Sequence, residues 1–384
     1  MNMTRKEFIK FCSLLGISLP FQNAMAVSNY VNPQSKFKGK VLIIGAGAAG
    51  LTAAYRLSQL GINYQILEAS SNFGGRMKTT NDFVDFPIPL GAEWLHVKRK
   101  IFDEIINNPT KEIKIETTHY NALDDALYDG EETFMNEMGF GIDQKFIGSS
   151  WLDFYKQYIL PSIQDKIMYE QIAKSIDYTS DKITIKTQND NFKADKVIVT
   201  IPVKMLQNNA ITFTPQLPED KREAIKDVTV WDGLKAFIEF SEKFYPTATE
   251  FNVSGQKMYY DASYGQNSER NVLGFFVVGD ASLPYLQLSD SELIKYILKE
   301  LDELFDGKAS QSYIKKISQN WSKEPFIKGA YVYDEESWRT VRTLGESVSN
   351  KIFFAGTAYT EGDDWGGVHS AAHSAIRSVN EILE

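Results

Sequence analysis

The sequence predicts an α/β protein of two domains, one built around a parallel sheet and the other from an antiparallel sheet with helices. Three observations predict this class. The apolar run Val41–Ile44 leads directly into the glycine-rich stretch GAGAAG and a helical pattern. Two further apolar runs, Val197–Ile201 and Ile352–Ala355, have the character of buried strands, and Trp231–Phe240 alternates like a strand. The length of 384 residues, of which 43% are hydrophobic, suits about two domains.

The first strand and its loop have a pattern that can hold a phosphate. Gly45 permits a tight turn, Gly47 allows the backbone to approach a pyrophosphate, and Gly50 lets the following helix pack against the strand. The helix is predicted over Ala48–Leu60. It would present its N-terminal N–H groups and the positive end of its dipole to an anion. A glycine-rich turn that binds nothing is the alternative.

The next strand, Tyr64–Leu67, is followed by an acidic residue, Glu68, eighteen residues after Gly50. A carboxylate in this place accepts hydrogen bonds from ribose hydroxyls. Strand, glycine loop, helix and acidic residue together predict a Rossmann-type dinucleotide-binding domain. This part of the sequence does not distinguish NAD from FAD.

The first 26 residues have the layout of a secretory signal peptide. The basic segment MNMTRKEFIK is followed by the apolar run FCSLLGISLPF and by Ala24-Met25-Ala26, which suits a cleavage site. We therefore expect an exported protein, periplasmic or secreted. The stretch TRKEFIK also resembles the twin-arginine export signal, with Lys6 in place of the second arginine. The general secretory route and an amphipathic N-terminal helix are the alternatives.

The composition argues against several kinds of partner. The net charge is −9, so no basic surface is expected that could neutralise nucleic-acid phosphates. No apolar run reaches the roughly 20 residues that span a bilayer, so no stable membrane anchor is expected. The single cysteine, Cys12, lies in the predicted signal peptide, and the four histidines lack the spacing of a metal site. His369 and His373 are four residues apart, and we interpret them as a pair on a helix surface, with a metal site as the alternative.

Two segments after Glu68 extend the nucleotide-binding pattern into a longer fingerprint. They are Gly74-Gly75-Arg76 and Gly91-Ala92-Glu93-Trp94. Together with the glycine loop they resemble the fingerprint of the flavin-containing amine oxidases, which include monoamine and polyamine oxidases. The resemblance implies that the cofactor is FAD and not NAD. It assigns to the cofactor Gly45, Gly47, Ala49, Gly50, Glu68, Gly75, Arg76, Gly91, Ala92, Glu93 and Trp94.

Later parts of the chain carry the same resemblance. Ile172 falls where the family's chain meets the adenine. The segment KIFFAGTAYTEGDDWGGVHS resembles the family's "FAG…VH" region along the flavin, which assigns Gly356, Thr357, Gly367 and Val368 to the cofactor. A helix is predicted from about Val368. The positive end of its dipole would stabilise an anionic reduced flavin.

The resemblance also implies a catalytic lysine. In the family, a lysine on the strand that corresponds to Trp231–Phe240 holds a water against flavin N5, and here that residue is Lys235. Burial would lower its pKa and let it share a proton with the water. A lysine exposed at the edge of a sheet is the alternative.

The segment NWSKEPFIKGAYVY resembles the family's tryptophan-containing segment next to the flavin, which assigns Trp321 to the cofactor. Tyr331 matches one wall of an aromatic cage for the amine, and Trp365 is expected to supply the other wall. Ala330 stands where monoamine oxidases attach FAD through cysteine, so FAD is expected to bind without a covalent link. Packing of these aromatic residues in a core is the alternative.

We therefore predict an FAD-dependent oxidase of an amine or amino acid, which transfers hydride to flavin N5 and yields an imine and, with oxygen, hydrogen peroxide. The FAD-binding domain is expected to comprise residues 39–96, 150–205 and 340–384, and the substrate domain residues 97–149 and 206–339. The partners would be a small-molecule amine and oxygen. One alternative is a C–C desaturase, porphyrinogen oxidase or isomerase on the same scaffold. The other is a non-catalytic flavin-binding module, which the short insertion and Gly367 keep open.

Overall fold

The computed structural model describes residues 37–120, 126–128, 143–250, 256–332, 337–361 and 366–384. The predicted signal peptide and Trp365 lie outside these residues. The chain divides into two compact units. The first takes its described residues from Met1–Phe73, Ile159–Thr229 and Val332–Glu384, and the second from Gly74–Tyr158 and Val230–Tyr331. The assignment of an FAD-binding and a substrate domain to particular ranges stays a prediction.

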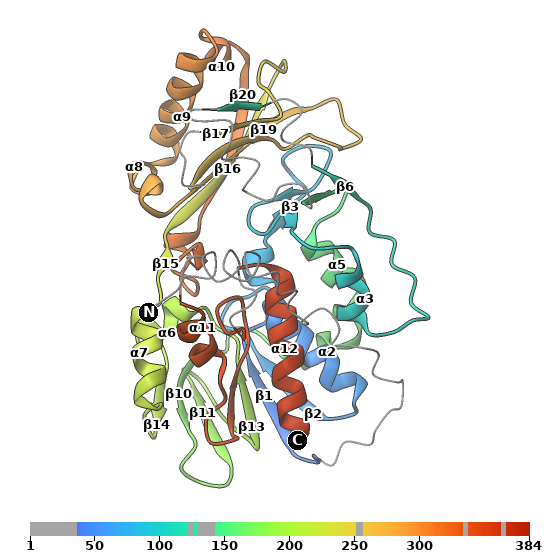
Figure 1. Cartoon of the computed structure of the whole chain (residues 1–384), viewed down its shortest axis with the longest axis vertical. Helices are drawn as coiled ribbons and strands as arrows, with labels where there is room; N and C mark the ends of the chain where they lie inside the picture. The colour runs from blue at the N-terminus through green and yellow to red at the C-terminus, as the bar shows by residue number, and fades with distance from the viewer. Residues whose placement is uncertain (1–36, 121–125, 129–142, 251–255, 333–336, 362–365) are drawn as a thin grey trace, which may run out of the picture. The chain divides into compact units, whose positions relative to one another are not determined.

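The first unit contains a five-stranded sheet in the order β22-β13-β1-β2-β9, in which all neighbours are parallel. Helix α2 (Ala48–Gln59) connects β1 to β2, and the C-terminal helix α12 (Val368–Leu383) packs beside it (Figure 1). The strands are β1 (Lys40–Ile44), β2 (Asn63–Leu67), β9 (Ile167–Met168), β13 (Lys196–Val199) and β22 (Ile352–Phe354).

Burial on both faces explains why these strands are apolar along their whole length. Val41, Leu42 and Ile43 of the central strand β1 have no exposed surface. A parallel sheet needs helices on its faces, and continuous apolar runs are the sequence signature of strands covered in this way. The three apolar runs of the sequence analysis therefore form one sheet, although they come from distant parts of the chain.

A second sheet of the first unit has the order β12-β11-β10-β14. Its pairs β10–β11 and β11–β12 are antiparallel, whereas β14 runs parallel to β10. The strands are β10 (Ala173–Asp177), β11 (Ile183–Thr187), β12 (Asn191–Ala194) and β14 (Thr212–Thr214). The remaining helical elements are α6 (Val203–Gln207), α7 (Glu219–Asp227), α11 (Trp338–Gly345) and the 3₁₀ turns η5 (Leu160–Ser162) and η6 (Gln164–Lys166).

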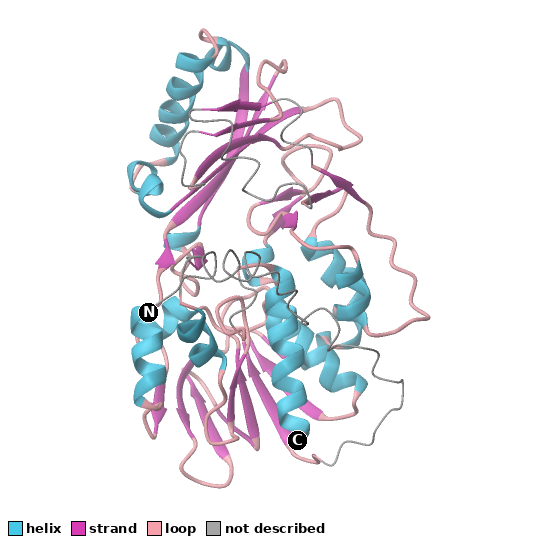
Figure 2. Cartoon of the chain, in the orientation of Figure 1, coloured by secondary structure: helices cyan, strands magenta, loops and turns pink. Residues whose placement is uncertain are grey.

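The second unit is built on a six-stranded sheet in the order β20-β16-β19-β18-β17-β7, with helices along it (Figure 2). All neighbours are antiparallel except β17 and β7. The strands are β7 (Ala126–Tyr128), β16 (Gly233–Phe240), β17 (Ala248–Glu250), β18 (Lys257–Asp261), β19 (Asn271–Val278) and β20 (Tyr313–Asn320). The helical elements are η7 (Gly279–Ser282), α8 (Leu283–Leu286), α9 (Asp290–Leu304) and α10 (Lys308–Ser312).

Both faces of the central strand β16 are covered, and all eight of its residues are buried. Ala236 and Ile238 pack with Leu293, Ile297 and Leu301 of α9 in one apolar cluster. The next cluster contains Phe237 and the apolar residues of the segment 83–90. Residues that alternate along a strand point to opposite faces, so Lys235 shares the face of Phe237 and not that of α9.

Smaller elements complete the second unit. They form the two-stranded sheets β3-β4 and β15-β21 and a three-stranded sheet in the order β5-β8-β6. The strands are β3 (Thr79–Thr80), β4 (Ile88–Pro89), β5 (Trp94–Leu95), β6 (Thr117–His119), β8 (Gln144–Phe146), β15 (Val230–Trp231) and β21 (Tyr331–Val332). The helical elements are η2 (Gly75–Met77), α3 (Lys100–Ile106), α5 (Trp151–Tyr158) and η8 (Trp321–Lys323).

The parallel sheet of one unit and the largely antiparallel sheet of the other agree with the predicted α/β class. Within the described ranges, no helix is both long enough and apolar enough to cross a bilayer.

In the first unit, the C-terminal end of helix α11 contacts a buried lysine of helix α7. Lys221 of α7 donates hydrogen bonds from Nζ to the carbonyl oxygens of Thr343 (2.7 Å) and Leu344 (2.9 Å), and Nζ lies 4.1 Å from the centre of the Phe354 ring. A cation at the C-terminal end of a helix interacts favourably with the helix dipole. Burial nevertheless lowers the pKa of Lys221 to about 7, with the Glu346 carboxylate opposing the shift.

We predict that Lys221 makes stability depend on pH. Because its pKa in the folded chain lies below the usual value, the unfolded chain binds one more proton between about pH 7 and the ordinary lysine pKa. The contribution to the free energy of unfolding should therefore rise with pH across this window, by about 1.4 kcal/mol per pH unit. Lys221→Met should lose this slope in denaturant titrations between pH 7 and 9.5.

The matched control is Lys226→Met, because Lys226 lies on the same helix and is exposed. It should keep the wild-type slope. Equal slopes for Lys221→Met and the wild type would show that Lys221 does not titrate in this window.

Candidate functional site

The glycine loop of the first unit joins β1 to α2. Gly45 has a φ of +110°, which a residue with a side chain rarely adopts. A Cβ on Gly50 would lie 2.0 Å from the carbonyl oxygen of Gly45, so only glycine fits there. A Cβ on Gly47 would meet nothing within 4 Å, which leaves this side of the loop open. Thr200, which the sequence analysis did not single out, donates from Oγ1 to the carbonyl oxygen of Ile44 (2.8 Å) and fixes the loop from β13.

Glu68 stands directly after β2 at the same loop. Its Oε2 accepts a hydrogen bond from the backbone N–H of Ala46 (2.6 Å), and its Oε1 accepts from the N–H (2.9 Å) and hydroxyl (2.8 Å) of Ser70. The carboxylate is half-buried. It is thus held beside the loop, in a place where it could accept hydrogen bonds from ribose hydroxyls.

The N-terminal end of α2 suits an anion. Gly47 precedes the helix, no side chain caps it, and its first turn has no acidic residue. The first N–H groups of a helix attract negative charge most strongly where no carboxylate has taken that place. Ala49 is buried in this first turn. The open side at Gly47, the uncapped helix and the fixed carboxylate of Glu68 therefore fit the pyrophosphate and ribose of a dinucleotide.

The other cofactor residues predicted for the first unit lie at the ends of strands and helices. Ile172 is half-buried between β9 and β10. Gly356, with a φ of +150°, follows β22 and donates from N to Oγ of Ser374 on α12 (2.9 Å), and Thr357 comes next. Gly367 precedes α12 and Val368 is its first residue. The helix predicted from about Val368 is therefore α12, which has sixteen residues. The positive end of its dipole lies at Gly367 and Val368.

In the second unit, three predicted segments come together around Arg76. Its guanidinium donates from Nη1 to the carbonyl oxygen of Ala330 (3.0 Å). Its own carbonyl oxygen accepts from the N–H of Ala92 (2.9 Å) and would lie 1.8 Å from a Cβ on Gly91. The indole of Trp321 donates to the carbonyl oxygen of Leu90 (3.0 Å). Gly75 is exposed and begins the 3₁₀ turn that carries Arg76.

Lys235 is buried and is not at the edge of its sheet, because β16 lies between β20 and β19. Nζ of Lys235 donates to Oε2 of Glu93 (2.6 Å) and to the carbonyl oxygens of Pro89 and Gly91 (3.1 Å each). Burial lowers the pKa of Lys235, and the charge and hydrogen bond of Glu93 oppose the shift. The alternative of an exposed edge lysine is therefore wrong. Its role toward a flavin stays a prediction.

Glu93 is the centre of a buried ionic cluster that the sequence analysis did not foresee. Besides Lys235, its carboxylate accepts a hydrogen bond from the hydroxyl of Tyr260 (2.5 Å) and lies 3.6 Å from Nζ of Lys145. Burial alone would raise the pKa of Glu93, but Lys235 and Lys145 bring it below the ordinary value. In the structure the Glu93 carboxylate contacts Lys235, Tyr260 and Lys145. Its role toward the cofactor stays a prediction.

Two further aromatic residues of the predicted site, Tyr331 and Trp94, have different surroundings. Tyr331 is half-buried on β21. Trp94 packs against Tyr120 and Tyr260, with ring centres 4.6 and 5.4 Å apart. Among the described residues there is no group of three or more His, Cys, Asp or Glu that could hold a metal ion.

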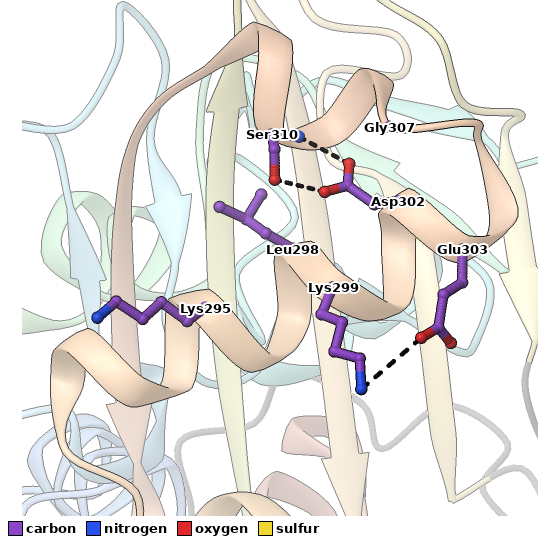
Figure 3. Close-up of a pocket in the computed structure, with 7 residues that line it drawn as sticks. All are labelled: Lys295, Leu298, Lys299, Asp302, Glu303, Gly307 and Ser310. Atoms are coloured by element: carbon purple, nitrogen blue, oxygen red, sulfur yellow. Dashed lines mark hydrogen bonds and ion pairs between the residues drawn. The ribbon is translucent and has the colours of Figure 1, made fainter.

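A surface pocket of about 420 Å³ lies elsewhere in the second unit, between α9 and α10 (Figure 3). Its polar groups bind one another: Asp302 accepts from the N–H of Ser310 (2.9 Å), and Lys299 pairs with Glu303 (3.8 Å). None of the predicted site residues lines it. The pocket therefore carries no part of the candidate site.

Comparison with known proteins agrees with this geometry. A model of the family described as flavin containing amine oxidoreductase matches residues 155–383, and a model of an NAD(P)-binding Rossmann-like domain matches residues 43–105. Polyamine oxidase 1 of Zea mays is 24% identical and covers 96% of this chain and 93% of its own length. Lysine-specific histone demethylase 1B of Mus musculus is 23% identical over 87% of this chain, which spans about half (52%) of the demethylase.

Among solved structures, wild-type putrescine oxidase bound to putrescine has a similar fold, with a TM-score of 0.71 and 15% identity. The match covers 90% of this chain and 99% of that one. At this identity the likeness concerns the fold.

The fold and the nucleotide loop define a protein with a Rossmann-type dinucleotide-binding domain. The family match extends over more than half of the chain, and the chain belongs to the flavin-containing amine oxidoreductase family. The resemblance stated from the sequence, the fold class, FAD as the cofactor and the class of amine oxidoreductase are thereby confirmed. The roles of individual residues stay predictions.

We predict that Gly47→Ala weakens FAD binding alone, whereas Gly50→Ala also lowers the stability of the apoprotein. A Cβ at Gly47 has room in the protein but takes the side that is open for the pyrophosphate. Gly47→Ala should therefore keep the wild-type melting temperature of the apoprotein and lose FAD affinity by at least about tenfold, which corresponds to about 1.4 kcal/mol. A Cβ at Gly50 meets backbone, so Gly50→Ala should lower the melting temperature of the apoprotein as well. Wild-type FAD affinity in Gly47→Ala would argue against this loop as the pyrophosphate site.

Proposed function

We propose that this protein is an oxidase of a small amine or amino acid. The carbon next to the amine nitrogen would lose a hydride, which leaves an imine that water hydrolyses. Oxygen would then take up the two electrons and be reduced to hydrogen peroxide. FAD, when bound, supplies the electron acceptor for this chemistry. The observation that supports the proposal most directly is Lys235, a buried lysine on β16 at the Gly91–Trp94 segment of the family fingerprint.

The chain's own groups account for binding and positioning. The glycine loop, the N-terminus of α2 and Glu68 would hold the pyrophosphate and ribose. Arg76, bound to the carbonyl of Ala330, would supply a fixed positive charge. Lys235 would hold a water in exchange for one of the three hydrogen bonds that Nζ makes to Pro89, Gly91 and Glu93. Tyr331 would present an aromatic face to the amine and exclude water from it.

Non-covalent FAD follows from the same residues. Ala330 stands at the family's position of cysteine attachment, and the only cysteine, Cys12, lies in the predicted signal peptide. The acidified and precipitated holoprotein should therefore release yellow FAD into the supernatant.

The function is tested by anaerobic mixing of the holoprotein with amines, polyamines and amino acids, and separately with compounds that contain no amine, while the flavin absorbance is recorded. At least one amine should bleach the flavin, and readmitted air should restore the colour with stoichiometric hydrogen peroxide. Bleaching by none of them, together with normal FAD content, would favour the non-catalytic flavin-binding module. Bleaching only by compounds without an amine would favour a desaturase or porphyrinogen oxidase. Rearrangement of such a compound without bleaching would favour an isomerase.

We also propose that the protein is exported. The support is the basic, apolar and small-residue order of the first 26 residues. The mature form should begin at Val27 when the protein from the periplasm or medium is sequenced from its N-terminus. Recovery from the cytoplasm alone, with Met1 retained, would contradict the proposal.

A further inference from the structure

The carboxylate of Glu93 faces two buried ammonium groups, and only one of them belongs to the predicted catalytic machinery. The second is Lys145 of β8, which is 2% exposed. Its Nζ lies 3.6 Å from Oε1 of Glu93 and donates hydrogen bonds to the backbone carbonyl oxygens of Asp261 and Ala262, each 2.9 Å away. A lysine is rarely buried to this extent unless its charge has a partner.

Three aromatic rings surround the same ammonium group. Nζ of Lys145 lies 5.3 Å from the ring centre of Trp94, 5.8 Å from that of Tyr120 and 5.7 Å from that of Tyr260. Ring faces attract a cation within about 6 Å, and the effect is larger where water is excluded. These contacts favour the charged form of Lys145. Unlike hydrogen bonds, they do not require that an N–H group point in a particular direction.

The two lysines differ in how many protons their hydrogen bonds require. Lys235 has three acceptors within 3.1 Å, so each of its three ammonium protons has a partner. Lys145 has two acceptors at hydrogen-bond distance, and its contact with Glu93 at 3.6 Å is an ion pair only. A neutral Lys145 could keep both hydrogen bonds, whereas a neutral Lys235 would leave one acceptor without a donor.

The charges around Glu93 do not balance. One buried carboxylate faces the two ammonium groups of Lys145 and Lys235. A further carboxylate that acts on Lys145, that of Asp261, is paired with Lys243 at 2.9 Å. Two cations that share one buried anion repel each other, and relief comes when one of them loses its proton.

We propose that Lys145 is a positioning residue, and that its charge sets how firmly Glu93 holds the Lys235 ammonium group. With Lys145 charged, the field of the Glu93 carboxylate is divided between two cations. With Lys145 neutral, the carboxylate acts on Lys235 alone. The importance of this for amine oxidation rests on the proposed function, in which Lys235 is the residue that holds the water.

The other titratable groups that face Lys145 do not take over this role. Burial raises the pKa of Tyr120 and of Tyr260, so both hydroxyls stay neutral where lysines titrate. On its own segment, Asp143 is paired with His96 at 2.9 Å. Burial lowers the pKa of Lys145 most, Lys235 lowers it further, and the carboxylates of Glu93 and Asp261 oppose the change.

The test replaces Lys145 with glutamine. The amide of Lys145→Gln can still donate to the carbonyl oxygens of Asp261 and Ala262 but carries no charge, so it imitates the neutral lysine. The holoprotein is labelled with lysine that carries ¹³C at Cε and ¹⁵N at Nζ, and the Lys235 signal is assigned by its loss in Lys235→Met. In the wild type the Lys235 signal should shift once at the pH where Lys145 loses its proton and again at its own titration. Lys145→Gln should lack the first of these two steps, because Glu93 then has a single cation to stabilise throughout.

The matched control is Lys243→Gln, which removes a cation from Asp261 and not from Glu93. It should keep both steps of the Lys235 signal. A first step of unchanged size in a Lys145→Gln protein of normal melting temperature would overturn the proposal.

If Lys145→Gln does not fold, Lys145→Arg decides the question. Its charge cannot be removed by titration, so the Lys235 signal should again lack the first step and its midpoint should lie below the wild-type value. A midpoint at or above the wild-type value would refute the proposal. Since this readout needs no amine, it is independent of whether any amine bleaches the flavin.

Discussion

The buried carboxylate of Glu93 is the interaction on which the second unit depends. Its partners come from three separate strands: Lys235 on β16, Lys145 on β8 and Tyr260 on β18. Removing one partner of a buried ion pair typically costs about 3–5 kcal/mol, because the remaining charge has no water to stabilise it. The carboxylate therefore fixes the position of the Gly91–Trp94 segment against the face of the sheet that is opposite α9.

The first unit depends on close backbone packing and not on buried charge. Gly50 approaches the carbonyl of Gly45 so closely that α2 could not start where it does with any other residue there. Thr200 then fixes the loop from the neighbouring strand. Precise placement of N–H groups is what binding of a phosphate requires, whereas placement of a lysine requires a charged partner. The two units thus use different kinds of interaction.

Local patterns made the first unit predictable from sequence. The strand, the three glycines and Glu68 lie within thirty residues, and each has a steric or hydrogen-bonding reason that applies to any sequence. Contacts over long distances were not predictable in this way. Arg76 binds the carbonyl of Ala330, and Lys235 meets Glu93, across 254 and 142 positions of the chain. No spacing in the sequence indicates such partners.

Lys145 shows the limit most clearly. It belongs to a strand of three residues, Gln144–Phe146, with no motif around it. A lysine in such a segment is usually exposed, and only the fold brings it beneath three rings. The same holds for Lys221, whose partners at the end of α11 lie more than 120 positions away. Buried lysines are therefore the residues whose surroundings are hardest to predict from sequence, because a lysine is normally exposed to solvent.

The order of segments in the parallel sheet has a consequence for how the chain folds during synthesis. Strand β1 and the glycine loop are made before β13, with which β1 pairs on one side, and before β22 and α12, which complete the unit. Contacts between distant segments slow folding, because long loops must close first. One side of the apolar strand β1 therefore stays uncovered until β13 and β22 have been made. During this interval the exposed apolar strand can aggregate, and a chaperone that binds it would favour folding.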